Sequence, residues 1–315
     1  MITLWPRRKF AQDASLGLPQ YSGQDEQPPT SASRPVAFMH IPKTSGTALM
    51  SGLAGSCESP ALVKGFDLCL FGSFRDFGTL DVSEQRRIYA SSASLPAECE
   101  LITGHFALST LRQAYPHAQI MTVLREPFTR LLSHWLFWRQ QTDPMLAPLG
   151  KWADFVRYAR QPLASFLSNP LVACQTDNLA LRMLLWPHPL IPVDQFINPI
   201  HYERLIKEAT AKLCSLEFVD ALENGDFVRN LERWLGRTLS YGRENETMPI
   251  PAEFRAPLHR EFTSEAHELL RARSQLDLQL WARIARRRIS DCDITELRER
   301  TILSNVARYG ALMAS

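Results

Sequence analysis

Residues 36–47 read VAFMHIPKTSGT, and this stretch sets the predicted fold. The apolar run at residues 36–40 is typical of a buried strand, and residues 42–46 combine proline, lysine, serine and glycine, which favour a loop. A helix is expected to follow over residues 47–53. A strand, a loop and a helix in this order form the repeating unit of parallel sheets that are covered by helices.

The rest of the chain continues this alternation of strands and helices. Further strands are predicted at residues 100–103, 119–124 and 216–219. Residues 127–141 predict an amphipathic helix with one apolar stripe. Beyond residue 151 the pattern is mainly helical, over residues 151–160, 177–186, 202–214, 227–235 and 264–288. We therefore predict an α/β fold with a P-loop-like parallel sheet flanked by helices and a helix-rich C-terminal half.

The sequence also predicts how the chain is divided. Residues 1–34 mix arginine, glutamine, serine and proline without apolar periodicity, which predicts a flexible tail. Residues 35–290 are expected to form one domain, because the later helices pack around the sheet. Residues 291–315 are expected to be a helical extension or a tail.

Composition limits the classes of function. The 315 residues carry a formal net charge of +2, which gives no reason to expect nucleic-acid binding. The six cysteines are scattered without a C-x-x-C pair, so reduced thiols are expected. The sequence has neither an apolar stretch of membrane-spanning length nor a signal-peptide pattern, which predicts a soluble, cytoplasmic protein. The sequon at Asn245 is treated as coincidental.

The loop at residues 40–47 is a candidate anion site. Free N–H groups at a helix N-terminus point toward a bound phosphate or sulfate, Gly46 permits close approach, and Lys43 adds positive charge. The spacing differs from the Walker A pattern, because the lysine precedes the glycine. The alternative is an ordinary strand-to-helix turn that is capped by a hydroxyl.

A second motif, TVLREPFTRLLSH, covers residues 122–134. The strand delivers Arg125 to its end, where the planar guanidinium can grip a phosphate. Ser133 lies off the apolar stripe of the next helix, so its hydroxyl can face a ligand. The pair predicts a second phosphate site, and the alternative is a surface ion pair with a solvated hydroxyl.

Together the two motifs resemble the carbohydrate sulfotransferases that act on heparan sulfate and related glycans, including soluble bacterial members. That family carries an I-P-K-T-G-G-T loop and an R-[DE]-P-x-x-R-x-x-S element, and the resemblance covers residues 36–140, with Ser45 in place of the first family glycine. It implies an enzyme that moves the sulfuryl group of 3′-phosphoadenosine 5′-phosphosulfate to a hydroxyl of a glycan or another acceptor. The co-substrate residues that it implies are Lys43, Thr44, Ser45, Gly46 and Thr47 at the 5′-phosphosulfate, and Arg125 and Ser133 at the 3′-phosphate.

Between these motifs, Gly104-His105 ends a predicted strand. In the resembling enzymes a G-H segment presents the catalytic base, so His105 is the candidate here. An imidazole with a pKa near neutrality can accept the proton of a hydroxyl. His40 is an alternative base or a residue that orients Lys43, and His134 is assigned to structure.

Sulfuryl transfer depends on positioning and electrostatics, so no metal is required, and Lys43 is expected to stabilise the leaving group. One rival function is an atypical nucleotide-dependent kinase, which would need magnesium ligands. Another is a non-catalytic binder of sulfated or phosphorylated glycans that uses Arg125 and Arg130. Aromatic and basic side chains could form a wall for a sugar chain or belong to the core; they are Trp135, Trp138, Trp152 and Arg139.

Overall fold

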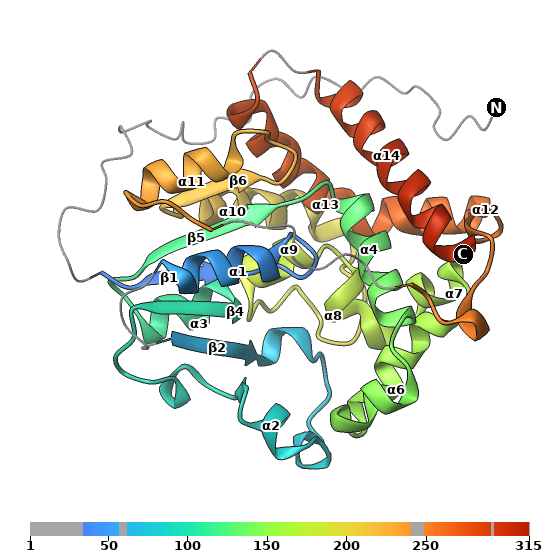
Figure 1. The fold of residues 1–315 in the computed structure, drawn as a ribbon, viewed down its shortest axis with the longest axis horizontal. Helices are drawn as coiled ribbons and strands as arrows, with labels where there is room; N and C mark the ends of the chain where they lie inside the picture. Colours follow the sequence, from blue (N-terminus) through green and yellow to red (C-terminus); the bar gives the residue numbers. More distant parts are fainter. Residues whose placement is uncertain (1–33, 57–61, 241–248, 291–292, 315) are drawn as a thin grey trace.

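The computed structural model describes residues 34–56, 62–240, 249–290 and 293–314 (Figure 1). The predicted tail up to residue 33, the sequon at Asn245, Cys57 and Cys292 lie outside this range. The four described cysteines are free thiols. None of the described helices is both long and apolar enough to cross a membrane.

Six parallel strands form one sheet in the order β3-β2-β4-β1-β5-β6. Their bounds are β1 Val36–Met39, β2 Leu62–Asp67, β3 Ile88–Tyr89, β4 Leu101–His105, β5 Gln119–Leu124 and β6 Phe218–Ala221. The predicted α/β fold with a parallel sheet is confirmed. The sequence missed β2 and β3, and it placed the last strand two residues early.

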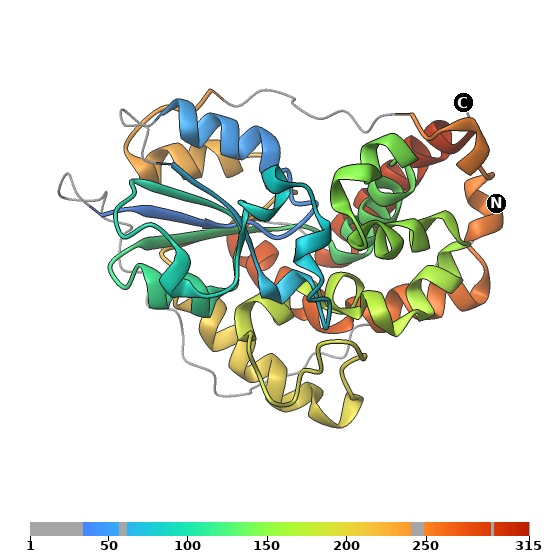
Figure 2. The ribbon, with the colours of Figure 1, turned by 90° about the horizontal axis from the view of Figure 1, so that it is seen from below.

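The side chains of β1 alternate between the two faces of the sheet. Val36 and Phe38 pack against α1 (Gly46–Gly55) and α11 (Phe227–Leu235). Ala37 and Met39 belong to the core of the opposite face. That core also includes residues of α3 (Leu108–Ala114), α9 (Leu179–Leu185), α10 (Tyr202–Cys214) and α13 (Ser264–Arg288). Figure 2 shows these two helical layers on either side of the sheet.

The second half of the molecule is helical, as predicted. Its core is built around α4 (Pro127–Arg139), with α6 (Trp152–Arg157), α7 (Leu163–Ser168), α12 (Leu258–Glu261) and α14 (Ile294–Ala314). Helix α14 occupies most of the range predicted as an extension or tail, and it packs beside α4 and α12 (Figure 1).

Helix α4 differs from the prediction of an amphipathic helix. Only Phe137 of its residues is exposed, because α14, α13 and α6 pack around the other sides. The aromatic and basic residues considered as a sugar-binding wall are buried: Trp135, Trp138, Trp152 and Arg139. That hypothesis is therefore wrong, and these side chains form part of the core.

Candidate functional site

The candidate residues meet where three neighbouring strands end. His105 ends β4, His40 follows β1, and Arg125 follows β5. Strand β1 lies between β4 and β5 in the sheet. Because all three strands are parallel, their carboxyl ends open at the same edge, which is where α/β proteins bind ligands. The fold thus brings together segments that are about 20 to 85 residues apart in the sequence.

The loop between β1 and α1 has an unusual backbone. Lys43 (φ 71°) and Ser45 (φ 63°) both adopt the left-handed conformation. The buried Thr44 hydroxyl donates to the carbonyl of Ile41 at 2.9 Å, which closes the turn. Lys43 and Ser45 are partly exposed, and Thr47 is exposed. The structure therefore gives Thr44 an internal partner, whereas its neighbours reach the surface.

Gly46 begins α1 directly over the His40 ring. A Cβ atom at this position would lie 1.8 Å from His40 Nε2. The ring has little room to move, since its centroid lies 5.2 Å from that of Phe38 and 4.4 Å from that of His105. Glycine is thus the residue that lets the helix N-terminus approach the strand end.

The first N–H groups of α1 lack intrahelical carbonyl partners, and the helix dipole adds partial positive charge there. Lys43 adds a cation, and its Nζ lies 4.1 Å from the centroid of the Phe137 ring. Burial, with the nearby Arg125 and Arg308, lowers the pKa of Lys43 to about 8. A loop with this charge and these donors favours anions.

Replacing Ser45 with glycine should stabilise the protein. The left-handed backbone strains a residue with a Cβ, so Ser45→Gly should raise the free energy of unfolding by about 0.5–1 kcal/mol. Urea unfolding would measure this. Ser51→Gly, at an exposed position inside α1, is the matched control and should lower stability by about 0.5 kcal/mol. Equal effects at the two positions would contradict the assignment of strain to Ser45.

Arg125 links the two motifs. It is partly exposed, and its Nη1 donates to the Lys43 carbonyl at 3.1 Å. Its Nη2 donates to Asn305 Oδ1 at 2.8 Å and to the Tyr309 hydroxyl at 3.0 Å. Both partners belong to α14. Sequence reasoning missed them, because nothing in the local pattern near residue 305 indicates a contact 180 residues away.

Ser133 lies on α4 and is buried, with 4% of its surface exposed. The sequence places Ser133 off the apolar stripe, where its hydroxyl could face a ligand, and in the structure the whole side of α4 that carries it is covered by other helices. Within the described part of the chain, no hydrogen bond joins Ser133 to Arg125 or to the Lys43 loop. A role for Ser133 in ligand binding stays a prediction.

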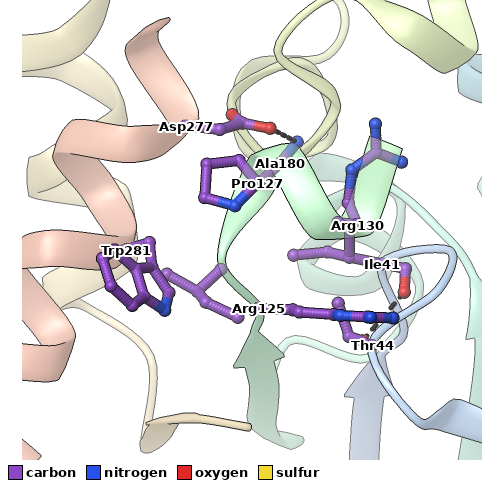
Figure 3. A pocket seen from close by; sticks show the side chains of 9 residues that line it. Ile41, Thr44, Arg125, Pro127, Arg130, Ala180, Asp277 and Trp281 are labelled. Carbon is purple, nitrogen blue, oxygen red and sulfur yellow. Dashed lines mark hydrogen bonds between the residues drawn. The ribbon is translucent and has the colours of Figure 1, made fainter. Parts of the chain in front are cut away.

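Arg130 is also buried, and its Nε and Nη1 have no hydrogen-bond partner. It lines a cavity of about 10 Å³ with Thr44, Arg125, Asp277 and Trp281 (Figure 3). Burial lowers the pKa of Arg130 to about 10 and raises that of Asp277 to about 6. The cavity has room for about one water molecule. Arg130 is therefore not on the surface where a glycan could reach it.

Gly104 turns the end of β4 so that His105 faces the loop. Its φ is 143°, and a Cβ atom would lie 2.1 Å from the Gly65 carbonyl oxygen of β2. The His105 Nδ1 lies 2.6 Å from the His40 carbonyl oxygen. A carbonyl only accepts, so Nδ1 carries the hydrogen and the neutral ring keeps its lone pair on Nε2. His105 is thus held in the tautomer of a proton acceptor.

The pKa of His105 differs from the near-neutral value expected. Burial lowers it to about 4; the hydrogen bond to the His40 carbonyl opposes this shift, and Arg87, Lys43 and Lys64 add to it. The ring is therefore neutral over the whole physiological pH range, and at this pKa it is a weaker base than an imidazole that titrates near neutrality.

His40 has a different environment. It is buried, and neither of its ring nitrogens has a hydrogen-bond partner. Burial, His105, Lys43 and Lys64 lower its pKa well below the usual value. His105 is partly exposed, so the structure favours His105 over His40 as the group that meets a ligand. His134 is buried as well, with its ring centroid 4.6 Å from that of Trp138.

In the ranges that the structure describes, no group of three or more His, Cys, Asp or Glu side chains could hold a metal ion. Comparison of the chain with protein-family models and with curated proteins finds no match.

Proposed function

We propose that the protein transfers the sulfuryl group of 3′-phosphoadenosine 5′-phosphosulfate to a hydroxyl group, with a carbohydrate as the acceptor. One observation supports the proposal most: the bond of 3.1 Å from Arg125 to the Lys43 carbonyl joins the two sequence motifs at the sheet edge where His105 ends β4. Such a site suits a donor that has phosphate groups at two ends, with an acceptor hydroxyl bound next to it.

In the proposed reaction the acceptor oxygen attacks the sulfur atom. Its proton passes to His105 Nε2, whose lone pair is free because Nδ1 donates to His40. The bond between sulfur and the bridging oxygen of the 5′-phosphate breaks, and adenosine 3′,5′-bisphosphate leaves. Lys43 and the N–H groups at the start of α1 stabilise the charge that grows on the leaving oxygen.

Thermal shift measurements test the class of ligand. Adenosine 3′,5′-bisphosphate should raise the melting temperature more than ATP with magnesium or a sulfated oligosaccharide, because binding to the folded state stabilises it. A larger shift with ATP and magnesium would favour a kinase. A shift with the oligosaccharide alone would favour a non-catalytic glycan binder.

Arg125→Ala should weaken the binding of adenosine 3′,5′-bisphosphate more than that of adenosine 5′-phosphate. The lost contact is to the 3′-phosphate, and a charged hydrogen bond contributes roughly 1.5–3 kcal/mol. Isothermal titration calorimetry with both nucleotides measures the difference, and Arg125→Lys tests charge without the planar fork. Equal losses for the two nucleotides would remove Arg125 from the 3′ position.

A further inference from the structure

Helix α14 closes one side of the candidate site. It passes beside α4 (Figure 1), and Arg298 near its start donates to the buried Glu126 carboxylate at 3.0 Å. Glu126 also accepts from the backbone N–H of Thr129 at 2.7 Å. This buried ion pair fixes α14 against the segment that carries Arg125. The helix is therefore a fixed wall of the site.

Asn305 and Tyr309 of α14 both bond Arg125, and Arg308 precedes Tyr309 on the same helix. Asn305, Arg308 and Tyr309 have the spacing i, i+3, i+4, which places them on one side of the helix. Asn305 Nδ2 donates to the Thr301 carbonyl at 2.9 Å, so its Oδ1 is turned to Arg125. The Arg308 guanidinium carbon lies 6.0 Å from the centroid of the Tyr309 ring.

These contacts limit the number of N–H groups that Arg125 can donate to an anion. Its Nη2 bonds Asn305 and Tyr309, and its Nη1 bonds the Lys43 carbonyl. The N–H groups that remain, on Nε and Nη1, are not the parallel pair that binds two oxygens of one phosphate. A phosphate that accepts two hydrogen bonds here therefore needs a second residue.

The charges point to Arg308 as that residue. Arg308 is exposed, and it lies near enough to Lys43 to help lower the pKa of that amine. Across the described ranges, no carboxylate forms an ion pair with Lys43, Arg125 or Arg308. Arg125 and Arg308 disfavour the charged form of Lys43 although the buried Glu223 carboxylate lies near Arg125, and a bound anion would relieve this repulsion.

We propose that Arg308 is an anion-binding residue of this site, delivered by α14, and that it holds a phosphate of the ligand together with Arg125. The nucleotide part of this inference rests on the proposed function, whereas the anion part does not. It gives the C-terminal helix a role in ligand binding in addition to packing.

Calorimetry with two probes tests the proposal, using adenosine 3′,5′-bisphosphate and inorganic pyrophosphate. Arg308→Ala should weaken the binding of each by about tenfold, and the loss should shrink at high salt because Arg308 is exposed. Arg308→Lys should recover part of the affinity. Arg300→Ala, an exposed arginine on the same helix, is the matched control and should bind like the unmodified protein. Thermal melting confirms that each variant is folded.

The outcomes separate this inference from the proposed function. Unchanged affinity in Arg308→Ala for both probes overturns the inference and leaves the function in place. Binding of pyrophosphate alone, with the expected loss in Arg308→Ala, supports the inference and overturns the function. If the unmodified protein binds neither probe, both are refuted. A gain of tenfold or more in the double variant Asn305→Ala with Tyr309→Phe would show that α14 competes with the ligand, which also overturns the inference.

Discussion

His105→Ala should lower the transfer rate by about 10²–10⁴-fold, the usual effect of removing a positioned base. The loss should fall on kcat more than on the KM for the sulfuryl donor, because in the proposed reaction His105 acts on the acceptor. His105→Asn is the sharper variant. Its amide can still donate to the His40 carbonyl but offers no basic nitrogen, so it should be as inactive as His105→Ala. Steady-state kinetics with calorimetry on adenosine 3′,5′-bisphosphate measures both effects.

His40→Phe is the matched control, since it keeps a ring between Phe38 and His105. It should retain activity within about tenfold if the proton goes to His105. An equal loss in His40→Phe, or near-normal turnover in His105→Asn, would contradict the assignment. Loss of nucleotide binding in all His105 variants would instead show that His105 is structural.

Lys43→Met should lower the transfer rate by about 10²–10³-fold, the range seen when one donor to a developing negative charge is removed. The cation is needed mainly in the transition state, so the affinity for adenosine 3′,5′-bisphosphate should fall less than the rate. Lys151→Met is the control, because Lys151 is exposed and pairs with Asp76 at 2.8 Å. A similar loss in that control would show that general positive charge, and not the position of Lys43, matters.

Lys43 should also set the pH dependence. Burial, Arg125 and Arg308 lower its pKa to about 8, and the proposed reaction requires the charged form. The value of kcat/KM should therefore be constant at neutral pH and fall as the pH rises above about 8. His105 is neutral above a pH of about 4, so its titration should not lower kcat/KM near neutral pH. In Lys43→Arg the fall of kcat/KM at alkaline pH should disappear. If the fall persists in this variant, it comes from the titration of another group.

The sequence predicted most of the sheet and the strand ends that carry the candidate site. Strand β1 is a continuous apolar run, and β4 and β5 are buried over most of their length, because both faces of these strands are covered. Strand β2 was not predicted, because Lys64 and Gly65 interrupt its apolar pattern. Strand β3 was not predicted because it has only two residues. Position in the sheet did not decide which strands were predicted, because the inner strand β2 was missed and the edge strand β6 was found.

The contacts made by α14 could not be predicted in this way. Asn305 and Tyr309 reach Arg125 across 180 and 184 residues of sequence. The all-round burial of α4 has the same origin, because distant helices cover the side that looked polar. The shifted pKa of His105 depends likewise on burial, which a motif of two residues does not reveal.

The distance along the chain between Arg125 and α14 has a consequence for synthesis. Strands β1 to β5 and the loop with Lys43 lie within the first 124 residues, and domains begin to fold as the chain emerges from the ribosome. The Arg125 guanidinium, however, meets Asn305 and Tyr309 only after α14 is made. A chain released before residue 305 would contain all six strands but would lack both α14 partners of the Arg125 guanidinium, so the shape of this edge of the sheet is set late in synthesis.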